Sequence, residues 1–253
     1  MKKIVILFLG AAFGGALPAL AAEGGDAAAE TSRLTLGQLM QMGGALMYVL
    51  TALSVVGLAL ILYYAVVLRQ RTVAPEAQAV RLRELLKERR TGEARNLCAR
   101  EPTALARVVG TALDFVQENP GADASAVKEV MESEGGRQAS RMQHMIHYLM
   151  DISSVAPMVG LLGTVIGMLR AFNTVAFDLA KARPMELAAG VGQALITTIA
   201  GLVVAIPALV AYAVFRGRVM KLTGQLEVSS SGLLSAIASQ GRPAAPRVPG
   251  GAE

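Results

Sequence analysis

Three long apolar segments dominate the hydropathy pattern of the chain, at residues 44–68, 149–177 and 187–215. The first and third contain no charged residue, and the densest apolar part of the second is Ala156–Phe172. A helix needs about 17 to 25 predominantly apolar residues to cross a bilayer, so each segment is long enough. The pattern predicts three transmembrane helices.

The polar segment 69–148 has a helical pattern of its own. Charges alternate through Arg81–Arg90 while Leu82, Leu85 and Leu86 share one face, which predicts an amphipathic helix. A second helix is expected from Glu101-Pro102 to about Glu118, and Asp123 is placed to cap a third that continues unbroken into the membrane. We therefore predict an all-α membrane protein whose long helices extend into a cytoplasmic helical bundle.

Small residues form a stripe along each of the last two apolar segments. Gly160, Thr164, Gly167 and Ala171 follow a 4-3-4 spacing, and Ala194, Thr198, Gly201, Ala205 and Ala208 follow a 4-3-4-3 spacing. Such spacings place residues on one helical face, and small residues let transmembrane helices approach closely. We expect these faces, with Gly163, to pack against neighbouring helices. Pro157 and Pro207 lie inside the same segments, where each removes a backbone hydrogen bond and can kink its helix.

Positive charges give the expected orientation. Arg69 and Arg71 follow the first apolar segment, and Arg216, Arg218 and Lys221 follow the third, so both ends should be cytoplasmic. Residues 178–186 then form a periplasmic loop, and 216–253 a cytoplasmic helix with a disordered tail from Gly241.

The N-terminus has the pattern of a secretory signal peptide over residues 1–22. Two lysines precede a short apolar run that ends in the small-x-small sequence Ala19-Leu20-Ala21. Cleavage would leave residues 23–43 as a periplasmic N-terminal segment. An uncleaved membrane anchor is the alternative.

Composition narrows the functional class. The chain is 53% hydrophobic and only 17% charged, which is typical of a membrane protein with a modest aqueous part. The net charge of +5 lies mostly in arginines that flank membrane segments, so no nucleic-acid partner is expected.

Cys98, the only cysteine, excludes an internal disulfide. His144 and His147 lack further ligands for a metal site, so we expect packing from them. No phosphate loop or nucleophile–base pair stands out, and we expect neither an enzyme nor a cofactor.

The sequences Ala156–Met168 (APMVGLLGTVIGM) and Gly190–Val210 (GVGQALITTIAGLVVAIPALV) resemble the ExbB/TolQ/MotA family of ion-channel and stator subunits, ExbB most of all. The resemblance covers roughly Leu36 to Leu234. It implies an inner-membrane homo-oligomer, usually a pentamer, whose pore is lined by the second and third helices. It also implies a partner resembling ExbD or TolR, with one membrane helix and an essential aspartate. Such a complex couples the proton motive force to work on a periplasmic TonB-like transducer.

On this resemblance Thr164 and Thr198 match the family's pore-facing threonines, and Thr197 adds a hydroxyl beside them. The alternative is that both hydroxyls donate to the backbone carbonyl four residues earlier, as threonines in membrane helices often do. Gln193 departs from the family, whose members commonly carry a glutamate there. Because an amide cannot titrate, any proton relay has to depend on the partner's aspartate.

Other functions remain open at this stage. A non-conducting membrane scaffold is supported by Gln193, and a solute permease is a weaker option because three helices offer no substrate-sized polar pocket. A stator for motility or envelope maintenance, driven by H⁺ or Na⁺, is a further alternative. Membrane lipids are expected partners in every case.

Overall fold

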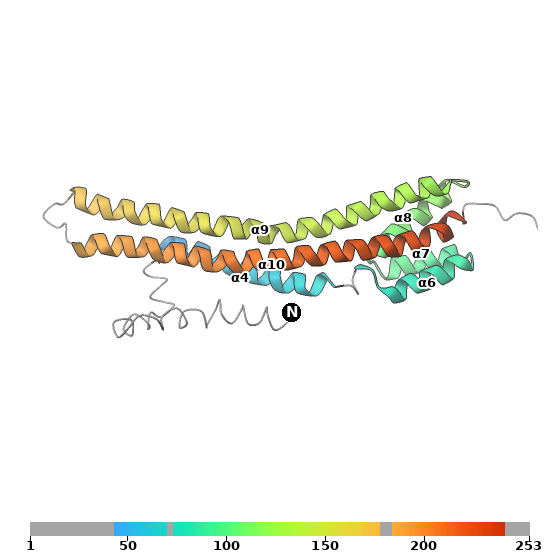
Figure 1. Cartoon of the computed structure of the whole chain (residues 1–253), viewed down its shortest axis with the longest axis horizontal. Coiled ribbons are helices and arrows are strands. Elements are labelled where there is room, and N and C mark those ends of the chain that lie inside the picture. The colour runs from blue at the N-terminus through green and yellow to red at the C-terminus, as the bar shows by residue number, and fades with distance from the viewer. Residues whose placement is uncertain (1–42, 70–72, 178–183, 241–253) are drawn as a thin grey trace, which may run out of the picture. The chain divides into compact units, whose positions relative to one another are not determined.

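The computed structural model describes residues 43–69, 73–177 and 184–240, which form helices and connecting turns without a strand (Figure 1). The predicted signal peptide, most of the 23–43 segment, most of the 178–186 loop and the C-terminal tail lie outside the described residues. The helices are α4 (Ala45–Val67), α6 (Glu76–Lys87), α7 (Thr91–Arg100), α8 (Ala104–Glu118), α9 (Ala124–Phe177) and α10 (Pro184–Ala238). Three of them, α4, α9 and α10, are long and apolar enough to cross a membrane. The all-α membrane fold is confirmed.

The described residues divide into two compact units. Among the described residues, the first unit contains 43–63, 146–177 and 184–214, so it holds most of the apolar residues of α4, α9 and α10. Its small core is centred on Leu50, Ala156 and Ala205, one residue from each helix.

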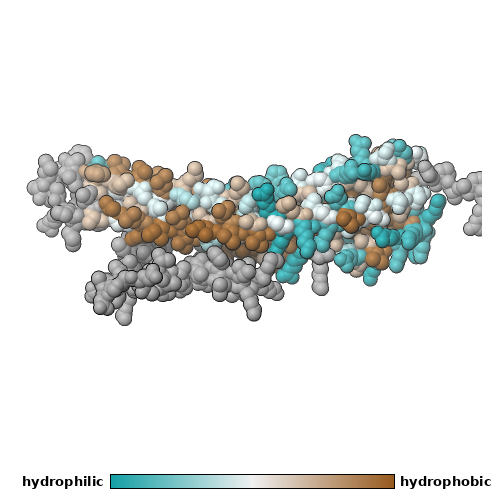
Figure 2. Space-filling model, viewed as in Figure 1, coloured by the Kyte–Doolittle hydropathy of each residue, from teal (hydrophilic) through white to brown (hydrophobic). Residues whose placement is uncertain are grey.

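Most large side chains of the first unit point outward. Leu161 is 62% exposed on α9 and Ile199 is 60% exposed on α10, and neighbouring apolar residues are similarly exposed. Figure 2 shows these hydrophobic side chains gathered over the membrane-spanning parts of the two helices. Burying such surface is worth about 25 cal/mol per Å², so these faces need lipid or other subunits around them.

The second unit contains Tyr64–Met145 and Phe215 onward, and it is an aqueous helical bundle with an apolar centre. Leu82 and Leu86 of α6, Leu105 and Val109 of α8, and Leu233 of α10 are almost completely buried in one cluster. Polar side chains gather over this unit in Figure 2.

The bundle also contains a buried amide that the sequence did not reveal. The Nε2 of Gln78 donates to the carbonyl of Glu101 at 3.0 Å, and its Oε1 accepts from the Thr103 hydroxyl.

Helix ends in this unit follow local capping chemistry. The Asp123 carboxylate accepts from the backbone N–H of Ala126 at 2.9 Å and from the Ser125 hydroxyl, and these bonds lower the pKa of Asp123. The cap is therefore present at neutral pH and is lost only as the pH falls through that lowered pKa. The helix that follows runs unbroken from Ala124 to Phe177, as predicted.

Two predicted boundaries need correction. The amphipathic helix expected over Arg81–Arg90 ends at Lys87, because Arg89 adopts a left-handed φ of 57° that interrupts the helix before α7 begins. The helix expected from Glu101-Pro102 begins at Ala104 instead. Thr103 is its N-cap, and its hydroxyl accepts from the backbone N–H of Ala106 at 3.1 Å.

We predict that the thiol of Cys98 is nearly inert in the folded protein. Cys98 is only 9% exposed, and burial, with the nearby charge of Asp114, raises its pKa to about 11. The reactive thiolate is thus scarce at neutral pH. A maleimide should label Cys98 slowly in the native protein and quickly in denaturant, as followed by mass spectrometry. Rapid native labelling would contradict the buried position.

Because Cys98 should be unreactive from either side of the membrane, an orientation test needs other cysteines. In a Cys98→Ala background, we expect Ala182→Cys to react with an impermeant maleimide in intact cells. The exposed Lys221→Cys should react only after permeabilisation, since the positive charges around it favour the cytoplasmic side. The opposite pattern would reverse the orientation proposed for the chain.

Candidate functional site

The membrane-spanning parts of α9 and α10 run antiparallel and touch through their small residues (Figure 1). A methyl group added at Gly201 would lie 2.7 Å from the carbonyl oxygen of Ala156 and 3.3 Å from the Cα of Gly160. One added at Gly167 would lie 3.0 Å from the carbonyl oxygen of Gly190. All three distances are shorter than an ordinary van der Waals contact, so glycine is needed for the two backbones to approach this closely.

Further small residues of the two helices are buried as well, namely Ala156, Ala171, Ala194, Ala205 and Ala208. The glycines of each stripe contact the other helix of the same chain. Pro157 and Pro207 both lie inside these helices, which continue through them.

Thr198 lies at the helix pair, where its hydroxyl reaches both helices. Its Oγ1 is 3.4 Å from the carbonyl oxygen of Gly160 on α9 and 3.4 Å from that of Ala194 on its own helix. The side chain is half-buried. These long contacts leave the hydroxyl able to exchange its acceptor, because a hydrogen bond of this length is weak.

Thr164 is half-buried and donates to the carbonyl of Leu161, three residues earlier, at 2.7 Å. No hydrogen bond within the described part of the chain joins Thr164 to Thr198. Both hydroxyls therefore use backbone carbonyls as acceptors. Only Thr198 reaches the carbonyl four residues earlier, and it also reaches Gly160 on α9, whereas Thr164 bonds three residues earlier. Each oxygen still has lone pairs that can accept a proton donor from water or from a partner.

Thr197 has a different environment from its neighbour. It is 1% exposed, and its Oγ1 donates to the carbonyl oxygens of Ala194 at 2.8 Å and Gln193 at 3.3 Å. A methyl group at Gly163 of α9 would overlap Thr197, and one at Gly43, just before α4, would lie 3.5 Å from its Cγ2. Thr197 thus fills the contact between α9, α10 and the residue just before α4, with its hydroxyl bonded to its own helix.

Gln193 lies beside the residue that precedes α4. A methyl group at Gly44 would come within 2.6 Å of the Gln193 Nε2, and the φ of Gly44 is +68°, a left-handed conformation that glycine adopts without strain. The Gln193 side chain is half-buried. This position makes Gln193 a neighbour of the start of α4 within one chain.

His147 packs against an aromatic ring of α10. Its ring lies edge-to-face with Tyr212, with centroids 6.0 Å apart, and the described residues contain no cluster of three metal ligands. The membrane-spanning parts of α9 and α10 also contain no Asp or Glu between Ile152 and Phe177 or between Leu187 and Phe215. These two spans therefore supply no titratable carboxylate of their own.

Comparison with known proteins agrees with this architecture. The profile of the MotA/TolQ/ExbB proton channel family matches residues 100–228, about half of the chain. The Tol-Pal system protein TolQ of Pseudomonas aeruginosa is 34% identical over 114 residues, which are 44% of this chain and 49% of TolQ. A putative biopolymer transport protein ExbB homolog of Methanothermobacter thermautotrophicus is 29% identical over 186 residues, which are 73% of this chain and 64% of that protein.

A putative ExbB-like protein of Synechocystis is 41% identical over 86 residues, which are 33% of this chain and 34% of that protein. The chain thus spans about half the length of the curated relatives it matches, from 34% to 64% among these three. The profile match covers both stripes, all of α8 and α9, and α10 as far as residue 228. The chain belongs to the MotA/TolQ/ExbB proton channel family, a family of membrane transport subunits.

Proposed function

We propose that this chain is the channel subunit of an inner-membrane complex that couples the proton motive force to work on a periplasmic, TonB-like transducer. The observation that carries the proposal is the α9–α10 contact. Two helices in backbone contact each present a half-buried threonine, and neither supplies a carboxylate. Such a pair is suited to line an ion path whose titratable group belongs to another protein.

The exposed apolar faces support assembly into a homo-oligomer, with the family's pentamer as the expected form. Large exposed side chains such as Leu169 and Phe172 on α9 and Leu209 on α10 offer surface for neighbouring copies and for lipid. We propose that an ExbD/TolR-like partner enters the centre of this oligomer with one helix. Its aspartate would sit near Thr164 and Thr198, whose free lone pairs accept from a protonated carboxyl or from water. Protons are the proposed ion.

The partner provides the test. Purification of the tagged full chain from its native membrane in mild detergent should yield a complex of several copies of the chain with a protein that has one membrane helix and an intramembrane aspartate. Native mass spectrometry measures the stoichiometry. Changing that aspartate to asparagine should abolish gradient-driven function while the complex persists.

A different result would favour the scaffold function. If the chain forms a homo-oligomer without such a partner, and its cellular role is unaffected by a protonophore, the chain is a non-conducting anchor. In that case Gln193, which cannot titrate, fits a packing position beside α4.

A further inference from the structure

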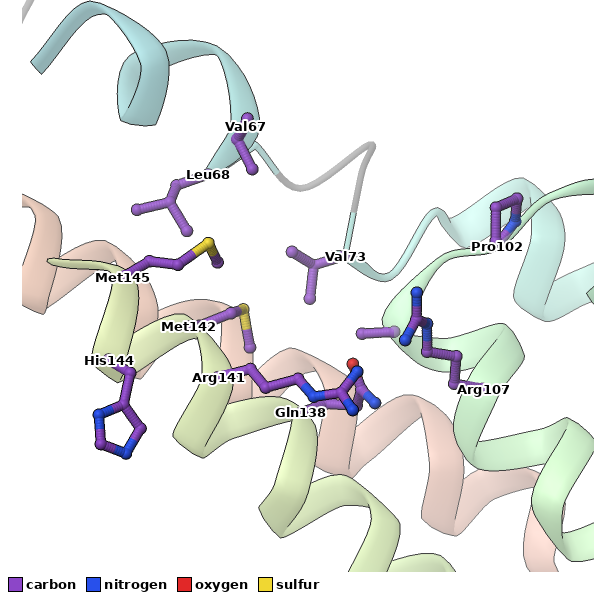
Figure 3. Close-up of a pocket in the computed structure, with 11 residues that line it drawn as sticks. Val67, Leu68, Val73, Pro102, Arg107, Gln138, Arg141, Met142, His144 and Met145 are labelled. Carbon is purple, nitrogen blue, oxygen red and sulfur yellow. The ribbon is translucent and has the colours of Figure 1, made fainter. Parts of the chain in front are cut away.

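A cavity of about 490 Å³ opens in the second unit, between the end of α4, the start of α8 and the adjoining part of α9. Its wall has two kinds of surface (Figure 3). Val67, Leu68 and Met145 form an apolar part at the end of the first membrane span. Arg107, Arg141 and Gln138 line the other, polar part of the wall.

The two arginines are available for a ligand. Both are exposed, and neither forms an ion pair with any residue that the structure describes. No Asp or Glu occurs among the described residues that line the cavity. The nearby Glu134 is already engaged, because it accepts from Gln138 at 2.6 Å and pairs with Arg137 at 2.8 Å. The cavity is thus a cationic site without a counterion of its own.

Some arginines elsewhere on the bundle are neutralised by carboxylates. Arg90 pairs with Glu88 and Glu93, and Arg95 pairs with Asp114 at 2.7 Å. Two unpaired guanidinium groups facing one cavity repel each other, and this arrangement becomes favourable when an anion with several oxygens joins them. Guanidinium groups bind phosphate oxygens through paired N–H donors, which makes arginine well suited to such an anion.

We propose that this cavity binds the headgroup of an anionic phospholipid, with phosphate oxygens between Arg107 and Arg141 and the first carbons of an acyl chain along Val67, Leu68 and Met145. The apolar part of the wall distinguishes a lipid from a soluble phosphate. It adjoins the last turn of α4, where the apolar span ends and Arg69 begins the charged segment, which is the depth of lipid headgroups. Basic pockets at the ends of membrane helices are typical sites for such lipids.

The test is native mass spectrometry of the full-length protein, purified in detergent and titrated with phosphatidylglycerol or with phosphatidylcholine of the same acyl chains. We expect phosphatidylglycerol to bind at one site per chain, and Arg107→Gln with Arg141→Gln to weaken that binding by about tenfold or more. Arg107→Lys with Arg141→Lys should retain most of it, because the charge remains. Since both side chains are exposed, neither substitution should unfold the bundle, and circular dichroism checks this.

The matched control is Arg81→Gln with Arg100→Gln, which removes the same charge from exposed positions on α6 and α7 outside the cavity. Equal loss of lipid in this control, or equal binding of phosphatidylcholine, would overturn the proposal. Displacement of the lipid by millimolar inorganic phosphate would assign the cavity to a soluble anion instead. If the Arg107/Arg141 variant binds lipid normally but loses its oligomeric state, the cavity is a contact between subunits and the lipid site is refuted.

Discussion

Gly201→Leu is expected to separate α9 from α10 and to dismantle the proposed homo-oligomer. The added side chain would start 2.7 Å from the backbone oxygen of Ala156, and a backbone cannot move aside as a flexible side chain can. Overpacking of a tight contact costs about 1–3 kcal/mol, and here the displaced groups are main-chain atoms on the facing helix. The outer faces of both helices would shift with them, so contacts between subunits should fail as well. Size-exclusion chromatography with light scattering in mild detergent measures the oligomer mass.

Gly192→Leu is the matched control, because it places the same side chain on the same helix where an added methyl group meets nothing within 4 Å. It should retain the wild-type mass. Gly167→Leu should behave like Gly201→Leu, since it opposes the carbonyl of Gly190. A Gly201→Leu protein that keeps the full oligomer mass would show that the close approach of the two helices is dispensable.

The sequence predicted this contact well but left its partner open. A stripe such as Gly160, Gly167 and Ala171 indicates close packing. The spacing puts the residues on one face of the helix, and their small size lets another helix approach that face closely. Nothing in one sequence distinguishes a helix of the same chain from one of a neighbouring chain. The structure resolves this, since Gly160 opposes Gly201 and Gly167 opposes Gly190 within one chain.

The fold class could be predicted because apolar length and charge pattern are strong signals, while the finer features depend on tertiary contacts. Arg89 takes a left-handed conformation that local propensity disfavours for a non-glycine residue, so the break between α6 and α7 was missed. Thr197 and Thr198 are adjacent and chemically identical, but successive residues of a helix point about 100° apart. Thr197 is therefore buried, whereas Thr198 is half-buried at the contact between α9 and α10. The cavity with Arg107 and Arg141 joins residues 34 positions apart, which no local pattern indicates.

The double variant Thr164→Val, Thr198→Val is expected to assemble normally and to lose gradient-driven function by about tenfold or more, the effect of raising a barrier by about 1.4 kcal/mol. Valine keeps the shape of threonine but removes the hydroxyl. Hydrogen bonds between membrane helices contribute on average only about 0.6 kcal/mol each, so losing the 3.4 Å contact from Thr198 to Gly160 should leave the helix pair intact. A loss of function would then come from the missing hydroxyls in the ion path and not from a disrupted fold. The measurement is proton uptake into proteoliposomes that contain the chain with its co-purified partner, with oligomer mass measured on the same samples.

Thr51→Val separates this effect from a general effect of removing a hydroxyl in the membrane. Thr51 lies in the α4 span, is exposed, and donates to the carbonyl of Met47 four residues earlier at 2.8 Å, so its local bond resembles those of Thr164 and Thr198. Thr197→Val is a second comparison, because its hydroxyl is buried in the three-helix contact. We expect Thr51→Val to keep full flux and Thr197→Val to affect stability more than flux. If the Thr164/Thr198 variant assembles with its partner and conducts at the wild-type rate, neither hydroxyl belongs to the path, and the α9–α10 pair then acts as a scaffold.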